Sequence, residues 1–335
     1  MEHITELKSL LSIPKDIALI THRNPDGDAI GSSLAMFHFL QHLGHVVKMI
    51  TPSEYPDFLS WMPGIEQMLV YDEYPDGIKS VLEKANLVIC LDFNALDRVD
   101  KVGEIVYGLN IPKVLIDHHL DPEPFADYVL SDITASSTSE LVYDFIHLLG
   151  WQQFLDVRVA DCIYTGIITD TGSFKYGTSA KLFRVVANLL ELGINDVVLQ
   201  DLINNNLSEK HLRLLGYCLY HRMEILEEFH TGIITLSKED YVKFDIQRGD
   251  TEGIVNYLLR IPGVKIAAFI TEQPTIVKIS LRSKGEFSVQ EIASQHFKGG
   301  GHRNASGGAS FIGLRPTVRK FKELLPLYKE KLSAE

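Results

Sequence analysis

Three potential metal ligands follow the first apolar run of the chain within seven positions. Residues 21–28 read T-H-R-N-P-D-G-D and include His22, Asp26 and Asp28. The proline and the glycine favour a tight turn, which can aim several side chains at one point. Asp28 could instead cap the helix that follows, but capping accounts for one aspartate and not for three ligands. The segment therefore predicts a metal site, with a helix cap as the alternative for Asp28.

Further carboxylates and imidazoles follow later apolar runs. Asp92 and the triplet Asp117-His118-His119 each come directly after a short strand-like run, and Asp170 follows a longer helical one. An aspartate at the end of a strand is often only a turn former. A carboxylate next to a long apolar stretch, however, is costly to bury without a partner. A metal ion would supply that partner.

Six of these side chains form a candidate ligand set: His22, Asp26, Asp28, Asp92, His118 and Asp170. Carboxylates and imidazoles without cysteine suit divalent ions such as manganese, magnesium or cobalt. Six ligands are too many for one catalytic ion with open positions. They favour two ions about 3.5–4 Å apart, the arrangement used to displace an oxygen at phosphorus. We expect Asp92 to bridge the ions, and a water activated by the pair to be the nucleophile.

The apolar pattern of the first half predicts the elements that would position these ligands. Strand-like runs alternate with helical patterns, with strands expected at 17–21, 46–50, 87–91 and 114–116 and helices at 29–43, 137–149 and 157–169. This alternation indicates an α/β domain with a parallel sheet buried on both faces. In such sheets ligands bind beyond the carboxyl ends of the strands, where the candidate residues lie.

The second half predicts a smaller domain with a mixed α/β sheet. Its expected elements are strands at 231–236, 265–270 and 276–281, a helix at 251–259 and a C-terminal helix at 317–332. We therefore expect a catalytic domain over residues 1–186, a helical linker over 187–222 and a substrate-binding domain over 223–335.

A candidate anion site lies in this second domain. Its residues are Arg282, Gly299, Gly300, Gly301, His302 and Arg303. The three glycines would let the backbone approach a ligand and present amides to an anion. Arg282, at the end of a predicted strand, can bind a terminal phosphate through two hydrogen bonds. The alternative for three glycines without the neighbouring histidine and arginine is a flexible turn.

Charge is unevenly distributed along the chain. The 335 residues carry 32 basic and 44 acidic side chains, a net charge of −12. Residues 223–335 carry 16 basic and 14 acidic side chains, a net charge of +2, which leaves −14 on residues 1–222. A negative global field disfavours a protein that coats long nucleic acids. It leaves room for short phosphorylated substrates, because metal ions would neutralise several of the carboxylates.

The cysteine content and the lack of an apolar segment long enough to span a membrane indicate the cellular compartment. Cys90, Cys162 and Cys218 are too few and too scattered for a disulfide framework or a zinc knuckle. Cys90 and Cys162 lie in apolar runs and suit small buried side chains in a reducing environment. No secretory signal is visible, and no run approaches the roughly 20 apolar residues that span a bilayer. We expect a cytoplasmic protein without membrane contact.

Five motifs, in order along the chain, resemble those of the DHH phosphoesterases that carry a DHH-associated C-terminal domain. Four are H-x-N-P-D-G-D-A-x-G-S at 22–32, Asp92, the triplet at 117–119 and G-I-I-T-D-T-G-S-F at 166–174. The fifth, G-G-G-H-R-N-A-S-G-G at 299–308, resembles the signature of the second domain. Within that family the chain is most similar to the short, stand-alone type of nano-RNase and pAp phosphatase.

The resemblance implies a role for each candidate. His22 and Asp26 would hold one ion, Asp28, His118 and Asp170 would hold the other, and Asp92 would bridge them, with Mn²⁺ as the usual metal. His119 would face the scissile phosphate as an acid or a hydrogen-bond donor. Arg282, in S-L-R-S at 280–283, would bind a terminal phosphate of the substrate.

The leading hypothesis is a phosphoesterase that hydrolyses nano-RNA and dinucleotides such as pApA and pGpG to mononucleotides, with 3′-dephosphorylation of pAp as a second activity. Cyclic-dinucleotide (c-di-AMP) phosphodiesterases share the motifs. A RecJ-like exonuclease fits less well, because it would need more single-strand-binding surface. A non-catalytic nucleotide-binding regulator would lack at least one ligand, and none is missing. The sequence leaves open whether the protein forms a homodimer.

Overall fold

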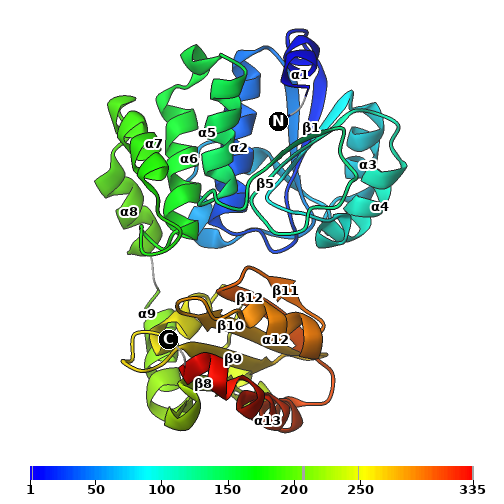
Figure 1. Ribbon diagram of the computed structural model, residues 1–335. Helices are drawn as coiled ribbons and strands as arrows, with labels where there is room; N and C mark the ends of the chain where they lie inside the picture. The colour runs from blue at the N-terminus through cyan, green and yellow to red at the C-terminus, as the bar shows by residue number, and fades with distance from the viewer. Residues whose placement is uncertain (2, 206–207, 248, 334–335) are drawn as a thin grey trace. The chain divides into compact units, whose positions relative to one another are not determined.

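The computed structural model describes residues 1, 3–205, 208–247 and 249–333. Contacts within the chain divide it into two compact units, Met1–Asn206 and Leu207–Glu335, each with its own six-stranded sheet (Figure 1). This boundary falls inside residues 187–222; the division into three parts with a linker there stays a prediction. None of the described helices combines the length and the apolar character needed to cross a membrane.

The first unit is built around six strands: β1 (Asp16–Ile20), β2 (Val46–Thr51), β3 (Met68–Val70), β4 (Leu87–Leu91), β5 (Lys113–Asp117) and β6 (Tyr128–Ser131). They lie in the order β3-β2-β1-β4-β5-β6, and every pairing between neighbours is parallel. This confirms the predicted parallel sheet. The chain leaves β1 toward β2 on one side and later returns to β4 on the other. Ligand sites of open parallel sheets lie at such a reversal of strand order.

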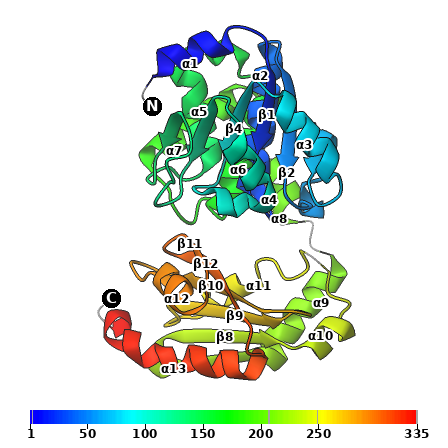
Figure 2. The same ribbon diagram turned by 90° about the vertical axis from the view of Figure 1, so that its right-hand side faces the viewer.

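Helices cover both faces of this sheet (Figures 1 and 2). One face carries α2 (Gly27–His42), α5 (Thr138–Leu148) and α6 (Val157–Asp170), and the other carries α3 (Pro75–Lys84) and α4 (Asp100–Gly108). The remaining helices are α1 (Ile4–Leu11), α7 (Ala180–Glu191) and α8 (Asp196–Asn204). Short 3₁₀ segments are η1 (Asp57–Leu59), η2 (Ile65–Gln67), η3 (Leu96–Val99) and η4 (Gln152–Phe154).

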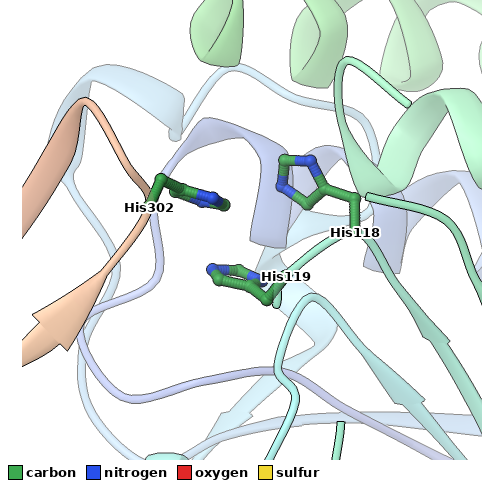
Figure 3. Close-up of side chains that lie close together, drawn as sticks. All are labelled: His118, His119 and His302. Carbon is green, nitrogen blue, oxygen red and sulfur yellow. The ribbon is translucent and has the colours of Figure 1, made fainter. Parts of the chain in front are cut away.

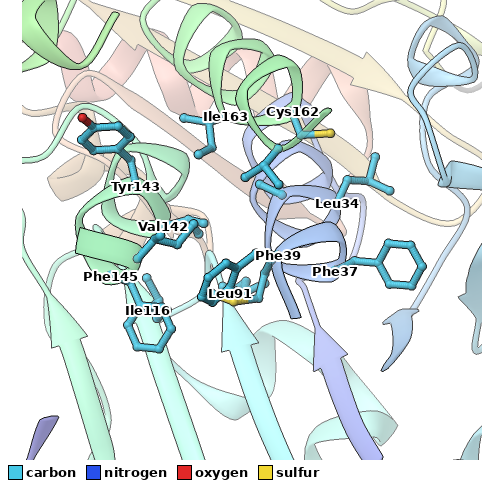
Figure 4. Close-up of a cluster of buried hydrophobic side chains, with 14 of the residues drawn as sticks. Leu34, Phe37, Phe39, Leu91, Ile116, Val142, Tyr143, Phe145, Cys162 and Ile163 are labelled. Atoms are coloured by element: carbon cyan, nitrogen blue, oxygen red, sulfur yellow. The ribbon is translucent and has the colours of Figure 1, made fainter. Parts of the chain in front are cut away.

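Alternate residues of β4 supply the two cores of this unit. Leu91 packs in the cluster under α2, α5 and α6, whereas Val88 and Cys90 pack in the cluster under α3 and α4. Figure 4 shows the first cluster, in which Leu91 and Ile116 lie among side chains of the covering helices. A strand buried on both faces has no polar position until it ends, so its first carboxylate, Asp92, comes at the edge of the sheet.

The three cysteines are buried and form no disulfide, as predicted for Cys90 and Cys162. Desolvation raises the pKa of the Cys218 thiol to about 12 and raises the pKa of the other two as well. These thiols are therefore protonated at neutral pH and serve as small packing groups.

Glycines allow the backbones of α2 and α6 to come into direct contact where the two helices cross. A Cβ on Gly31 would lie 2.7 Å from the carbonyl oxygen of Cys162 and 2.8 Å from the amide of Gly166. A Cβ on Gly166 would collide with the Ser139 side chain on α5. The three helices therefore pack this closely only because these side chains are missing. The crossing brings the start of α2 next to the end of α6, where Gly27 faces Thr169.

The second unit contains the strands β7 (Met223–Leu226), β8 (Thr231–Leu236), β9 (Ile266–Glu272), β10 (Val277–Ser283), β11 (Gly300–Gly301) and β12 (Ala305–Ser310). Their order is β11-β12-β10-β9-β8-β7; β8 and β9 are parallel and the other pairs are antiparallel. This confirms the predicted mixed sheet. One core lies under α12 (Val289–His296) and α13 (Leu314–Ser333). The other lies under α9 (Glu209–Tyr217), the π-helix Cys218–Arg222 and α11 (Ile254–Leu258), with α10 (Lys238–Lys243) and η6 (Glu227–Phe229) completing the unit.

Two elements of the second unit differ from the sequence pattern. The helix expected over 251–259 is shortened to α11, because Gly253 takes a left-handed conformation with φ +74° immediately before it. The glycine-rich segment 299–308 contains β11 and β12, which pair as antiparallel strands. Glycine has a low preference for strands, so the composition gives no sign of this pairing.

We predict that Gly31→Ala lowers the free energy of unfolding by about 1–3 kcal/mol, because the added methyl group overpacks the crossing with α6. Denaturant unfolding measures this. Gly108→Ala at the end of α4 is the matched control, since nothing lies within 4 Å of its added Cβ. Equal stability of the two variants would contradict the role given to the crossing.

Candidate metal centre

Asp92 lies at the centre of a cluster of carboxylates and imidazoles beyond the ends of β1, β4 and β5. It is 2% exposed, and its Oδ2 lies 3.5 Å from Nε2 of His22 while its Oδ1 lies 3.6 Å from Nε2 of His118. Asp26 joins His22 and Asp92 in a group whose candidate ligand atoms lie within 4.8 Å of one another. Asp92 is also held in the left-handed region with φ 65°. That conformation is costly for aspartate and is typical of functional sites.

Asp28 and Asp170 complete the cluster on the other side of His118. Nε2 of His118 lies 3.5 Å from Oδ2 of Asp170 and 3.9 Å from Oδ2 of Asp28. Asp28 is the second residue of α2 and Asp170 is the last residue of α6. The close crossing of these two helices therefore brings the carboxylates together. All six residues that the sequence predicts as ligands meet at one edge of the parallel sheet.

Backbone contacts orient the two imidazoles. Nδ1 of His22 lies 2.9 Å from the carbonyl oxygen of Arg23, and Nδ1 of His118 lies 3.4 Å from that of Ala135. A carbonyl oxygen can only accept a hydrogen bond, so each ring carries hydrogen on Nδ1 as the donor and turns Nε2 toward the carboxylates. This is the usual support for a histidine that binds a metal. Figure 3 shows the rings of His118 and of its neighbour His119 where the chain leaves β5.

The start of α5 supports the cluster, and sequence reasoning missed it. The backbone amides of Thr138 and Ser139 donate to the two oxygens of Asp28 at 2.6 and 2.9 Å, and the Thr138 hydroxyl donates to Asp92 at 3.0 Å. The amides at a helix N-terminus favour a negative charge. The sequence contains a signal for this end, because Ser137 and Glu140 have the spacing of a capping box. Asp26, and not Asp28, caps α2, accepting from the amides of Asp28 and Ala29 at 3.1 Å.

Concentrated negative charge dominates the electrostatics of the cluster. Desolvation raises the pKa of Asp92 and Asp28, and neighbouring carboxylates raise that of Asp92 further. Desolvation would lower the pKa of His118, but Asp170, Asp92 and Asp28 outweigh it and raise the pKa to about 9. The pKa of Asp26 is lowered overall. Desolvation alone would raise it, but the positive charge of His22 and the hydrogen bonds from the capping amides outweigh desolvation. In the described chain the ion-pair partners of Asp28 and Asp92 are histidines rather than lysine or arginine.

These residues fit a divalent cation. The donors are carboxylate oxygens and imidazole nitrogens, and the carboxylate oxygens lie 3.5–3.9 Å from Nε2 of His22 or His118. These distances are longer than a typical hydrogen bond. Two ligands about 2.1 Å from one ion lie only about 3–3.5 Å from each other. A cation would therefore draw the groups slightly inward and neutralise the repulsion that raises the pKa of Asp92 and Asp28.

Asp117 orients His119, the third residue of the triplet. Oδ1 of Asp117 lies 2.8 Å from Nδ1 of His119, and Oδ2 accepts from the His119 amide at 3.1 Å. Asp117 is fully buried, and His119 is 7% exposed. Desolvation lowers the pKa of His119 despite the opposing effect of Asp117. The sequence places Asp117 in a motif, but its role as the partner of Nδ1 is visible only in the structure.

Arg282 lies on the face of β10 opposite the core of α12 and α13. Lys278, Ser280 and Arg282 alternate with the buried core residues of the strand, and Nη1 of Arg282 donates to the carbonyl of Leu281 at 2.9 Å. In the pairing with β12, Arg282 lies opposite Ala305. Arg282 is half-buried there.

The glycines of the 299–308 segment serve different purposes. A Cβ on Gly299 or Gly301 would collide with the backbone of β12, so the pairing of the strands requires glycine there. At Gly300 nothing lies within 4 Å of an added Cβ. The sequence suggested that a ligand could closely approach the backbone at all three glycines. Of the three, Gly300 has open space for such an approach. His302 donates its amide to Ala305, and Arg303 forms a surface ion pair with Glu286.

Comparisons with known proteins agree with this arrangement. The chain matches the model of the DHH family, N-terminal domain, over residues 16–167 and that of the DHHA1 domain over residues 228–332. A protein of Thermus thermophilus named bifunctional oligoribonuclease and PAP phosphatase NrnA is 32% identical over 327 residues, 97% of this chain and 92% of the relative. This chain belongs to the DHH family.

Two further similar proteins match over nearly their whole length. A Bacillus subtilis protein, also named bifunctional oligoribonuclease and PAP phosphatase NrnA, is 27% identical over 97% of this chain and 99% of its own length. The crystal structure of an exopolyphosphatase-related protein from Bacteroides fragilis is 40% identical, with a TM-score of 0.94 over 99% of this chain and 97% of that one. The DHH domain match spans all six strands of the parallel sheet, and the DHHA1 match begins just after β7.

We predict that Asp117→Asn lowers kcat for a phosphodiester about 10- to 100-fold, because the carboxylate that orients His119 is lost. Mn²⁺ affinity, measured by calorimetry, should stay the same, since Asp117 is not among the six expected ligands. Asp121→Asn, at an exposed position of the same loop, is the control. A loss of Mn²⁺ affinity that accounts for all of the lost activity would assign Asp117 to the metal instead.

Proposed function

We propose that this protein is a metal-dependent phosphoesterase that hydrolyses short oligonucleotides, dinucleotides included, to mononucleotides and removes the 3′-phosphate of pAp. The observation that carries the proposal is the cluster of carboxylates and imidazoles around Asp92 at the reversal point of a parallel sheet. The names of the similar proteins from Thermus thermophilus and Bacillus subtilis supply the substrate class.

We assign two divalent ions to the cluster, with Mn²⁺ as the favoured metal. His22 and Asp26 would hold one, His118, Asp28 and Asp170 would hold the other, and Asp92 would contact both. Bound there, the ions would supply a water of lowered pKa and neutralise charge on the phosphoryl oxygens. Asp92 suits the shared position because its two oxygens face different histidines.

The chain itself positions the reacting groups. The amides at the start of α5 fix both oxygens of Asp28, and the hydroxyl of Thr138 fixes Asp92. Asp117 holds Nδ1 of His119, which directs the other ring nitrogen, Nε2, away from this contact. We assign that nitrogen to the scissile phosphate, where it would donate a hydrogen bond or a proton to an oxygen of the phosphoryl group.

The second unit would recognise the end of the substrate. Arg282 offers a planar pair of donors to a terminal phosphate, and the open backbone at Gly300 together with His302 and Arg303 would add contacts. Residues 223–335 carry a net charge of only +2. Such a weak field suits one or two phosphates rather than a long strand, whose binding rests on many cationic contacts.

A turnover panel with Mn²⁺ tests the function. The substrates are pApA, pGpG, five-residue RNA, long single strands, pAp, cyclic di-AMP and inorganic polyphosphate. We expect the highest kcat/KM for the dinucleotides, measurable release of phosphate from pAp, and no turnover after chelation by EDTA. A preference for long strands, cyclic di-AMP or polyphosphate would overturn the proposed substrate class, and full activity in EDTA would overturn the metal mechanism.

Asp92→Asn should lower kcat about 1000-fold or more, because both ions would lose a shared ligand. The metal-free variant should unfold at the same or a higher temperature than the wild type. Burial raises the pKa of Asp92, so its charged form destabilises the metal-free fold at neutral pH, and the amide removes that cost. Asp97→Asn, at an exposed position in the same loop, is the control. Near-normal turnover by Asp92→Asn would exclude the bridging role.

Arg282→Ala should lower kcat/KM about 10- to 100-fold for substrates with a terminal phosphate, by loss of a bidentate contact. Bis-p-nitrophenyl phosphate, which has no such phosphate, should be hydrolysed at nearly the normal rate. Lys278→Ala, an exposed cation four residues earlier on the same face of β10, is the matched control. Equal losses on both kinds of substrate would refute the anchoring role.

A further inference from the structure

Two arginines flank the metal centre, and their side chains have different partners. Arg23 donates to both carboxylate oxygens of Asp72 at 2.8 Å and forms a second ion pair with Asp100. Arg98 forms no ion pair with a carboxylate in the described part of the chain, although Asp100 is only two residues away. Asp72 and Asp100 are thus engaged by Arg23, and in the described residues Arg98 is left without an ion pair.

The backbone of Arg98 is fixed above the ends of three strands. It belongs to η3, in the segment that follows Asp92, and its carbonyl accepts from the amide of Arg23 in the loop after β1 at 2.9 Å. The same segment is tied to the loop after β5, because the Asn94 side chain donates to the carbonyl of Leu120 at 2.6 Å. A further hydrogen bond joins the Leu96 amide to the Glu123 carboxylate at 3.1 Å. These contacts involve the backbone of Arg98 and leave its guanidinium out.

The charge of Arg98 acts on His119. Desolvation is the main cause of the lowered pKa of His119, and the positive charges of His118 and Arg98 add to it. Arg98 is half-buried, so its charge is less screened than that of a surface arginine. Arg98 follows Asp92 by six residues, and its carbonyl is bound to the amide of the residue after His22, so the side chain starts beside the metal centre.

We propose that Arg98 binds the phosphoryl group that is hydrolysed, donating hydrogen bonds to its non-bridging oxygens on the side of His119. The inference rests on the proposed phosphoesterase function and adds to it a cation supplied by the catalytic unit itself. Residues 1–222 carry a net charge of −14, so a substrate phosphate entering this unit needs a fixed positive group. A planar guanidinium that is not engaged by a carboxylate suits this task.

Three variants test the proposal with bis-p-nitrophenyl phosphate and pApA as substrates in Mn²⁺. Arg98→Ala should lower kcat/KM about 100-fold on both, the usual cost of removing a donor to a phosphoryl or carbonyl oxygen. Arg98→Lys should recover part of the lost kcat/KM, because lysine restores the positive charge but not the planar pair of donors of the guanidinium. Lys101→Ala, an exposed cation three residues away at the start of α4, should behave as wild type.

Three further readouts separate this role from a structural one. The melting temperature and the Mn²⁺ affinity of Arg98→Ala should match those of the wild type, because the contacts of η3 are made by the backbone. Added guanidinium ion should restore part of the turnover of Arg98→Ala and leave that of Arg282→Ala unchanged. Normal turnover of bis-p-nitrophenyl phosphate by Arg98→Ala, or a loss explained wholly by lower Mn²⁺ affinity, would overturn the proposal.

The proposed function and this inference fail in different ways. An inactive wild type would refute the proposed phosphoesterase, while an active wild type matched by Arg98→Ala would refute only the role of Arg98. Calorimetric titration with pAp in Mn²⁺ tests Arg98 even if turnover is absent. Weaker binding by Arg98→Ala than by wild type and Lys101→Ala would support the contact, and equal binding by all three would contradict it.

Discussion

Repulsion among buried carboxylates is the constraint on which the catalytic unit depends. Asp28 and Asp92 lie within reach of the same imidazole, His118, and their raised pKa values record the cost of holding them there. The fold offsets this cost with fixed donors, namely the amides and the hydroxyl at the start of α5. Strand ends, helix ends and a strained backbone at Asp92 all serve to keep like charges close. Such an arrangement suits a protein whose stable working form contains a cation.

The two units divide the electrostatic task. The first unit concentrates negative charge. Near the metal centre, Arg23 is engaged in internal ion pairs with Asp72 and Asp100. The second is close to neutral and carries Arg282 on β10, opposite Ala305 of β12. Under the proposed function, reaction and recognition would be placed on separately folded cores, and each could vary without repacking the other.

Much of the fold and of the metal centre could be predicted from the sequence, because buried parallel strands are recognisable as apolar runs that end in polar residues. The positions of Asp92 and of the 117–119 triplet were predictable for this reason, and so was the mixed sheet of the second unit. The capping-box spacing of Ser137 and Glu140 marks the start of a helix but not what that helix contacts. The amides of Thr138 and Ser139 bind Asp28, which is 110 residues away in the chain, so only the fold brings these groups together. The cap of α2 depended on the turn geometry at residues 24–28, which decides between Asp26 and Asp28. The strand pairing of the 299–308 segment was hidden by its glycines, of which Gly299 and Gly301 are required by the neighbouring backbone of β12.

The contact between Gly31 and Gly166 makes the spacing of Asp28 and Asp170 a matter of backbone dimensions. Helices that touch through side chains can shift by fractions of an ångström when their core is repacked. Here the backbones of α2 and α6 are in direct contact. Their separation therefore does not depend on which side chains pack elsewhere in the core. The hydrophobic residues around the crossing are thus free to drift through evolution while the two carboxylates keep their separation.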